Sequence, residues 1–373
     1  MTRWPLVLAA LPLAAALAAA CGDDDSGDDG PGDGSDSDAA VSGVDAGVTD
    51  DCPNRTAAQG EPETELPARA ILDGDFTGSD LAGLSGIRMV NGSVRLEGSA
   101  GAVELADLEV ITGDLVITAD PDALTSIRLP ALQTVGGSVQ IDAPGLASLD
   151  APALESTGGV AAAAADVDLH CLVSGSVALG GHAGAALDLG KLRTAGVVKL
   201  DGMAALASLE LPALEQGSLI VSDAPALASI ALPALTGTPA QLRLLGCGAL
   251  TDLSLGAITS IGAVQVADAA SLADLGAFDA IQDADSLAIE NDDALTALGF
   301  PALVTVRGAL DLRDNSALAE IGLGALTEIG EDSAITDNPL LPTCDVQGLR
   351  DRVRENGSLA AFLIHDNADD DCR

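Results

Sequence analysis

Residues 206–249 read LASLELPALEQGSLIVSDAPA and then LASIALPALTGTPAQLRLLGCGA, which are two successive copies of one repeat unit. The pattern continues along the chain, and the next copies open at Leu250, Leu272, Leu295 and Leu318. The steps between these openings, starting from 206, are 21, 23, 22, 23 and 23 residues long. An earlier copy, LTSIRLPALQTVGGSVQIDAPG, runs from 124 to 145. Self-similarity at a fixed short period is typical of a solenoid in which each repeat forms one coil.

Within a unit the apolar positions follow the pattern L-x-x-L-x-L-x-x-L-x-x-I/V-x-G-x-V-x-I. Much of it has the two-residue period of β-strands. The proline of the LPAL segments belongs at a bend or at a strand's first residue, because proline cannot donate a ladder hydrogen bond. The sequence therefore predicts an all-β fold, a parallel β-helix of about a dozen coils spaced about 4.8 Å apart, with Leu, Ile and Val stacked inside.

A helical repeat is the alternative, because Ala and Leu are strong helix formers. Against it stand 42 Gly and 17 Pro, which the repeat places regularly inside each unit. Helical repeats are also longer, at roughly 33–47 residues.

One position of the unit, three residues before the opening leucine, changes character along the chain. It holds Asp292, Asn315 and, before Leu341, Asn338, whereas earlier coils place small residues there: Ala143, Ala224, Cys247 and Ala269. Stacked polar side chains at this corner are expected to satisfy backbone groups as an internal ladder. Cys247 is interpreted as a small buried thiol rather than a reactive one.

These repeats resemble the receptor L-domain family, which is a leucine-rich-repeat-like, right-handed β-helix. The resemblance covers about residues 70–372 and is clearest from 206 to 341. The ending NPLLPTC at 338–344, followed by an amphipathic stretch and a distant cysteine, is similar to the C-terminal cap of bacterial lipoproteins of this kind. Members of the family often carry a cysteine at the start of the first coil. Gly86-Ile87-Arg88 has none, which leaves the partner of Cys52 open.

A C-terminal cap, residues 342–373, is expected to follow the solenoid of residues 67–341, because the last coil would otherwise expose strand edges and an apolar layer. Residues 345–355 place Val346, Leu349 and Val353 on one helical face. Residues 359–364 are expected to form a last strand. Cys344 and Cys372 flank this segment, and in an exported protein we expect them to form a disulfide.

The N-terminal residues 1–21, MTRWPLVLAALPLAAALAAAC, have the plan of a secretory signal peptide over residues 1–20. Arg3 precedes an apolar run that is short for a spanning helix, and three alanines precede Cys21. This arrangement resembles the bacterial lipobox, which implies a lipidated Cys21. An ordinary signal peptide with a chance cysteine is the alternative. Residues 21–66, rich in acidic residues, are expected to form a disordered tether.

Composition restricts the function classes. With 57 acidic and 16 basic residues the formal net charge is -41, which excludes nucleic acid as an expected partner because phosphates would be repelled. Aromatic residues are 1% of the chain, too few for the stacking platforms of most sugar clefts. The histidines are His170, His182 and His365, and none lies in a recognisable nucleophile or zinc motif. A metal site built from His170, Cys171 and His182 has no standard spacing, and these histidines are interpreted as facing solvent.

The sequence therefore predicts a non-enzymatic lipoprotein of the cell envelope, held on a membrane by its N-terminal lipid, with the outer membrane or cell surface preferred. Its solenoid would present a binding, adhesion or structural surface to an extracellular protein or glycan. No catalytic residue, metal site or cofactor is predicted, and the oligomeric state stays open. The alternatives are a polysaccharide-acting β-helix enzyme, whose carboxylate pair could come from the many acidic residues, and a calcium-dependent adhesin.

Overall fold

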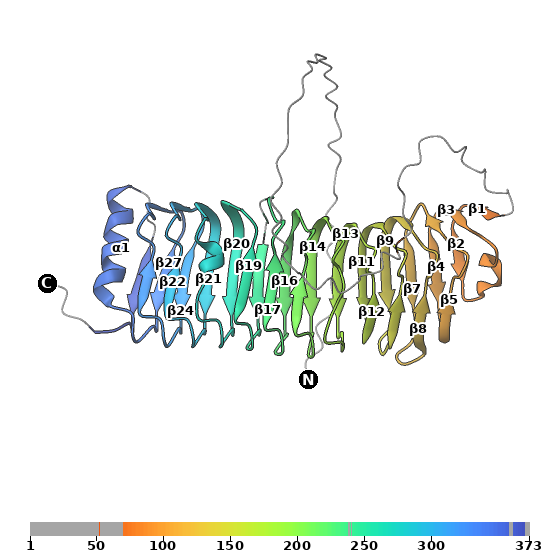
Figure 1. The fold of residues 1–373 in the computed structure, drawn as a ribbon, viewed down its shortest axis with the longest axis horizontal. Helices are drawn as coiled ribbons and strands as arrows, with labels where there is room; N and C mark the ends of the chain where they lie inside the picture. The colour runs from red at the N-terminus through yellow and green to blue at the C-terminus, as the bar shows by residue number, and fades with distance from the viewer. Residues whose placement is uncertain (1–51, 53–69, 238, 240, 358–360, 370–373) are drawn as a thin grey trace, which may run out of the picture. The chain divides into compact units, whose positions relative to one another are not determined.

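The computed structural model describes residues 52, 70–237, 239, 241–357 and 361–369. The described chain is all-β, with about 12 stacked parallel coils of ~22 residues and one C-terminal helix. Figure 1 shows these coils side by side from β1 (Ile71–Asp73) to β28 (Phe362–His365), with the helix α1 (Thr343–Glu355) beside the last of them. Both the fold class and the C-terminal helix predicted from the repeat are confirmed.

The largest sheet runs through every coil and contains 19 strands. Besides β1 and β28, it holds β2 (Phe76–Gly78), β3 (Met89–Asn91), β4 (Val94–Glu97), β6 (Val110–Ile111), β7 (Leu115–Thr118), β9 (Thr134–Asp142), β11 (Ser156–Ala163), β13 (Ser174–Gly180), β14 (Thr194–Asp201), β16 (Gln216–Ser222), β18 (Gln241–Leu245), β20 (Ser260–Ala267), β21 (Asp283–Glu290), β23 (Thr305–Val306), β24 (Leu310–Arg313), β26 (Glu328–Ile329) and β27 (Ser333–Thr336).

Three smaller sheets are formed by the L-x-x-L segments on another side of the coils. They contain β5 (Gly101–Glu104), β8 (Leu124–Arg128), β10 (Ser148–Asp150) and β12 (Asp166–Asp168); β15 (Ser208–Glu210), β17 (Ser229–Leu232) and β19 (Asp252–Leu255); and β22 (Ala297–Gly299) and β25 (Glu320–Gly322). Short 3-10 turns span Leu81–Leu84 and Gly276–Phe278.

The register of the parallel strands places equivalent residues of successive repeats on top of one another. Val177 pairs with Val160 on one side and Val198 on the other, and Val198 pairs in turn with Leu219. All four are buried. Because every coil repeats the alternation, apolar side chains form continuous columns inside the solenoid, and this burial is the main term that holds the coils together.

Several proline and glycine residues of the chain lie in the turns between strands. Pro130 and Pro212 lie in turns just after strands, so the lost N–H donor costs no ladder bond. Gly330 follows β26, and a Cβ there would overlap the carbonyl oxygen of Arg307 in the previous coil. Glycine at this position is therefore required by the close approach of two coils at this corner.

The C-terminal end of the solenoid is covered by α1. Val346, Leu349 and Val353 of this helix are buried, as the apolar face predicted for residues 345–355 requires. Arg352 donates from Nη1 to the carbonyls of Leu323, at 2.9 Å, and Gly324, at 2.6 Å. The last strand, β28, ends one residue beyond the predicted stretch 359–364, of which residues 358–360 lie outside the described part.

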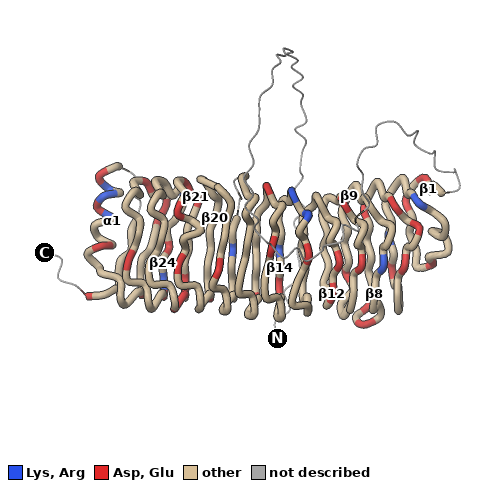
Figure 2. The backbone as a smooth tube through the Cα atoms, in the orientation of Figure 1, with Lys and Arg blue, Asp and Glu red and all other residues tan. Residues whose placement is uncertain are grey.

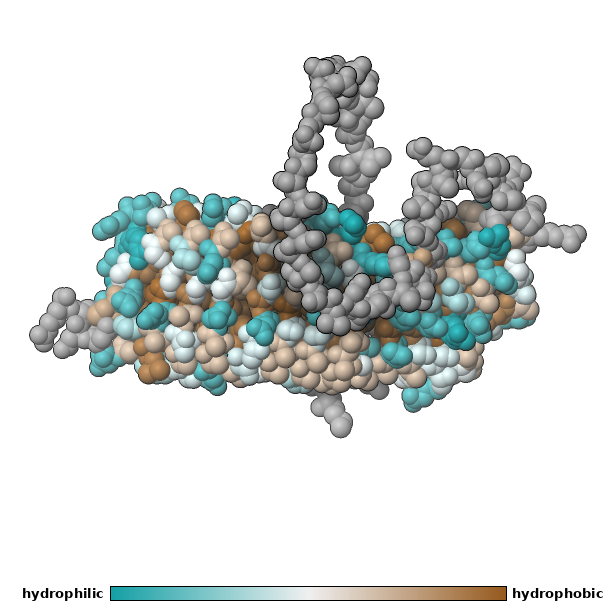
Figure 3. Space-filling model, viewed as in Figure 1, coloured by the Kyte–Doolittle hydropathy of each residue, from teal (hydrophilic) through white to brown (hydrophobic). Residues whose placement is uncertain are grey.

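Acidic residues recur on successive coils, with few basic residues between them (Figure 2). Several arginines pair with an acidic residue one coil away: Arg88 with Glu109 at 2.6 Å and Arg193 with Glu215 at 3.0 Å. These pairs are exposed and add little stability. Because basic residues are few and several of them are already paired, most of the acidic surface is left without a positive partner. Figure 3 shows hydrophilic residues interspersed among apolar ones over the visible face.

No helix in the described part of the chain has both the length and the apolarity that a membrane span requires.

Candidate functional site

A disulfide joins Cys52 to Cys171, with 5.6 Å between the Cα atoms. Cys171 is buried and lies in the turn between β12 and β13, near the middle of the coil stack. Cys52 precedes the first strand by 19 residues. The disulfide therefore links Cys52 covalently to a coil far from the one that follows it in the sequence. This pairing, which the sequence left open, also removes Cys171 as a metal ligand, because a disulfide sulfur is not a thiolate.

The other cysteines differ in what can be said of them. Cys344 lies at the start of α1 and is disulfide-bonded. Cys372 lies outside the described residues, as does Cys21, so the Cys344–Cys372 pair and the lipidation of Cys21 stay predictions. Cys247 is a free, fully buried thiol. Burial raises the pKa of Cys247 to about 11, partly offset by backbone hydrogen bonds, so the thiol stays protonated and unreactive, as interpreted from the sequence.

The prediction that the histidines face solvent is wrong for His182, which is buried. Its Nε2 lies 3.0 Å from the carbonyl oxygen of Ala186, and its Nδ1 has no partner among the described residues. His182 follows the left-handed Gly181 and therefore occupies the inward slot of its coil, equivalent to Met203 in the next. His170 is part-exposed and lies with Nδ1 2.6 Å from Asp168 Oδ1. The structure does not bring His170 and His182 together with a free Cys171.

The corner after the V-x-I strand holds a left-handed residue in successive coils from β13 to β28. Glycine fills it in three coils (Gly181, Gly202 and Gly246), and Asp or Asn fills it in six: Asp223, Asp268, Asn291, Asp314, Asp337 and Asp366. Asn and Asp tolerate this backbone conformation better than other residues with a side chain. These nine residues form a column along one corner of the solenoid, and five of the six side chains in it are acidic. The left-handed conformation of the turn accounts for the choice of Asp and Asn at these positions. No buried polar group among the described residues marks them as a binding site.

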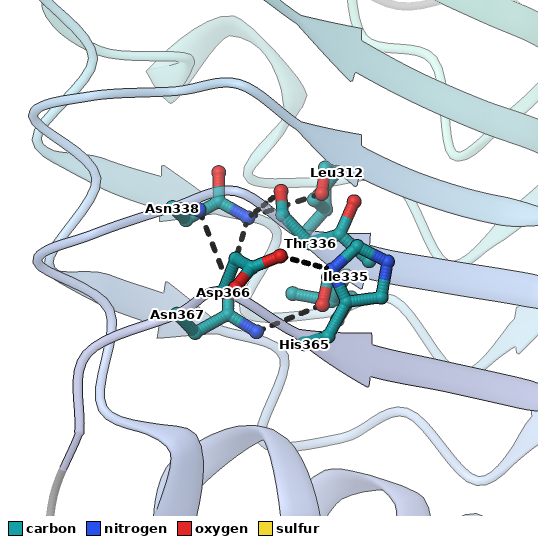
Figure 4. A network of polar contacts seen from close by, with 7 residues as sticks. All are labelled: Leu312, Ile335, Thr336, Asn338, His365, Asp366 and Asn367. Atoms are coloured by element: carbon teal, nitrogen blue, oxygen red, sulfur yellow. Dashed lines mark hydrogen bonds and ion pairs between the residues drawn. The ribbon is translucent and has the colours of Figure 1, made fainter.

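Two residues of this column and the neighbouring His365 form a cluster of potential metal ligands. Asp337, His365 and Asp366 each offer a ligand atom, and the three atoms lie within 4.8 Å of one another. Figure 4 shows His365 beside Asp366, with Nδ1 2.8 Å from Asp366 Oδ2. Both side chains are largely exposed. A contact between two adjacent, exposed side chains contributes little on its own, and it does not define a metal centre.

The inward slot next to this column holds the polar ladder that the sequence predicted. The backbone N–H of each slot residue donates to the side-chain Oδ1 of the next coil: Ala269 to Asp292 at 2.7 Å, Asp292 to Asn315 at 3.1 Å, Asn315 to Asn338 at 3.1 Å and Asn338 to Asn367 at 3.3 Å. Asp292, Asn315 and Asn338 are 0–1% exposed. The ladder therefore satisfies backbone groups of four consecutive corners away from water.

The amide groups of the asparagines complete this ladder. Asn315 Nδ2 donates to the carbonyl of Ile289 and to Asn338 Oδ1, both at 3.1 Å. Asn338 Nδ2 donates to Leu312, to Thr336 and to Asn367 Oδ1, and Asn367 Nδ2 donates to Ile335 (Figure 4). Asn367 was not predicted from the sequence, because α1 separates it from Asn338 by 29 residues instead of 23. The repeated dipeptide Asp-Asn, at 314–315, 337–338 and 366–367, is the signal that identifies it.

Asp292 is the one acidic member of the ladder. Its Oδ2 is buried and has no hydrogen-bond partner among the described residues. Burial raises the pKa of Asp292 to about 6, and the carboxylates of Asp268, Asp293 and Glu290 act in the same direction. The N–H of Ala269 opposes these effects by donating to the carboxylate.

Two hollows bear on whether a small ligand could bind. One, of about 10 Å³, lies inside the solenoid between Leu219, Leu242 and Ile261 and holds at most a water molecule. The other, of about 260 Å³, is a shallow depression beside the first turn, lined by Leu81, Leu84 and Asp107 among others. Neither combines depth with the convergent polar groups of a typical active site.

Comparison with known proteins adds no further assignment: no protein-family model, curated protein or solved structure matches the chain.

Proposed function

We propose that this chain is a non-enzymatic lipoprotein of the cell envelope whose β-solenoid presents a binding, adhesion or structural surface. In this proposal the signal peptide, residues 1–20, is removed and Cys21 carries the lipid. The acidic residues that follow connect the lipid to the solenoid, with the outer membrane or the cell surface as the preferred location. An extracellular protein or glycan would be the partner, in keeping with the similarity of the repeats to receptor L-domains.

The observation that carries the proposal is the Cys52–Cys171 disulfide. Disulfides persist in oxidising compartments outside the cytosol, so this bond supports export. It also supports a tether, because it fastens the chain just after the acidic segment onto a buried position of the solenoid. A covalent joint there would let residues 22–51 connect the lipid to a rigid body.

Metabolic labelling with palmitate tests the anchor. We expect label on the wild-type protein and none on Cys21→Ala, because acylation requires the thiol of Cys21. The matched control is Cys52→Ala, which removes another N-terminal cysteine and is expected to keep the label. Label on Cys21→Ala, or its absence from the wild type, would contradict the proposed anchor.

Complete tryptic digestion without reductant tests the joint. The only basic residues near Cys171 are Arg128 and Lys191, so it falls in the peptide 129–191. We expect mass spectrometry to find this peptide linked to the one that ends at Arg55 and contains Cys52. The same digest reports on the predicted pair of Cys344 and Cys372, whose peptides are 314–350 and 355–373. Free thiols at Cys52 and Cys171 would exclude the joint.

A further inference from the structure

The asparagine ladder contains one irregularity at its end. In the three coils that follow β21, the corner reads Asp-Asn, with the aspartate outside and the asparagine inside. In the β21 coil the order is reversed to Asn291-Asp292, so a carboxyl group takes the place of the buried amide. The exposed Asn291 donates to Asp268 in the neighbouring coil.

The hydrogen bonds of the neighbouring asparagines show which contacts a side chain makes at this position. Asn315 and Asn338 each use Oδ1 as an acceptor for the preceding coil and Nδ2 as a donor to a backbone carbonyl of that coil. Asp292 Oδ1 already accepts from Ala269 N–H, as the asparagines do. Its Oδ2 therefore corresponds to the Nδ2 of the asparagines, which donates a hydrogen bond.

In Asn315 and Asn338, Nδ2 donates to acceptor groups. The equivalent groups around Asp292 are also acceptors. Val266 is the register equivalent of Ile289 and Leu312, so its carbonyl is the counterpart for Asp292. Asn315 Oδ1 corresponds to Asn338 Oδ1, the second acceptor of Asn315. In the position that Nδ2 takes in the asparagines, an ionised Oδ2 would repel both acceptors, whereas a protonated Oδ2 can donate as an amide does.

No nearby cation offsets a negative charge at this position. None of the ion pairs between described residues includes Asp292. The charged groups that act on Asp292 are the carboxylates of Asp268, Asp293 and Glu290. The basic residues on its own coil and the two adjacent coils, residues 250–317, are Arg307 and Arg313, which pair with Asp285 and Asp311 at 2.9 Å each. Burial and the surrounding carboxylates both favour the neutral form of the Asp292 carboxyl group.

We propose that Asp292 is a neutral carboxylic acid in the folded solenoid and that its proton completes the ladder, so that its own contribution to stability is larger in acid than at neutral pH. This inference concerns the fold and is independent of the proposed lipoprotein function.

The direction and range of the pH dependence follow from the pKa of Asp292. The pKa in the folded chain, about 6, lies above the ordinary value of 3.8 for an aspartate, so the folded state holds the proton more tightly than the unfolded state. The stabilising contribution is fully present below pH 3.8 and is lost as the pH rises through 6. Over this range Asp292 alone is expected to raise the unfolding equilibrium constant about 100-fold.

Denaturant unfolding of full-length Asp292→Asn and wild type from pH 4 to pH 8 tests the proposal. Asparagine supplies a permanent donor, so the ratio of the two unfolding constants should change about 100-fold, with the variant gaining stability relative to wild type as the pH rises. Asp293→Asn is the matched control, because it removes an exposed charge from the next residue, and its ratio to wild type should change far less. A ratio for Asp292→Asn that is constant with pH would overturn the proposal.

A direct titration keeps the proposal testable if the variant does not fold. The side-chain carboxyl of Asp292 in wild-type protein labelled with ¹³C at that carbon should titrate near pH 6. Titration below pH 4.5 would show that the group is ionised in the ladder and would overturn the proposal.

Discussion

Replacing Cys171 with alanine is expected to lower the free energy of unfolding by about 2–5 kcal/mol, the range typical for removal of a native disulfide from a small secreted domain. The disulfide closes a loop across a sequence separation of 119 residues, so it restricts the unfolded chain strongly. Equilibrium denaturation with and without reductant would measure the loss.

The matched controls for this prediction are Cys52→Ala and the variant in which both Cys52 and Cys171 are replaced by alanine. All three variants lack the same bond, so they should be destabilised to a similar extent, and reductant should affect none of them further. Cys171 is buried, whereas Cys52 is part-exposed, so a somewhat larger loss for Cys171→Ala reports lost packing. Equal stability of wild type and Cys52→Ala would show that the bond does not contribute.

Substitution of Asn338 by alanine is expected to cost about 3 kcal/mol or more. Its Oδ1 accepts from both the backbone N–H and the Nδ2 of Asn315, and its Nδ2 donates to two carbonyls and to Asn367. The substitution leaves a buried N–H of Asn315 without an acceptor, which alone costs about 1–3 kcal/mol. Thermal or denaturant unfolding would report the change.

Ser316→Ala is the control for the ladder. Ser316 lies at the same corner as Asn315, but it is exposed and donates to Asp293 on the surface. Its loss should change the stability by no more than about 0.5 kcal/mol. If Asn338→Ala were equally mild, the buried amides would not be what holds these corners together.

The repeat was the part of the fold that could be predicted from the sequence. Strand alternation, the turn prolines and the slot at Asn315 all recur at the coil period, so each copy supports the others. The inward position of His182 was not predicted, because its coil lacks the usual apolar pattern and only the left-handed Gly181 marks its register.

The candidate site was harder to predict, because its main features depend on contacts that have no period. Nothing in the spacing of Cys52 and Cys171 relates one to the other, since one lies before the first coil and the other within a degenerate one. Asn367 was missed because α1 interrupts the period, and the reversal at Asn291-Asp292 acquires meaning only when the donors of the neighbouring asparagines are known.

The Cys52–Cys171 bond also determines how the molecule would bear tension. Pulling the segment before Cys52 against a partner held by the C-terminal coils loads the chain from the Cys171 turn toward α1. The strands from β1 to β12 lie inside the covalent loop and carry none of that load. Without the bond, the same pull would enter at the first strand, where coils can peel away one at a time, so this single cross-link moves the force past nearly half of the solenoid's strands.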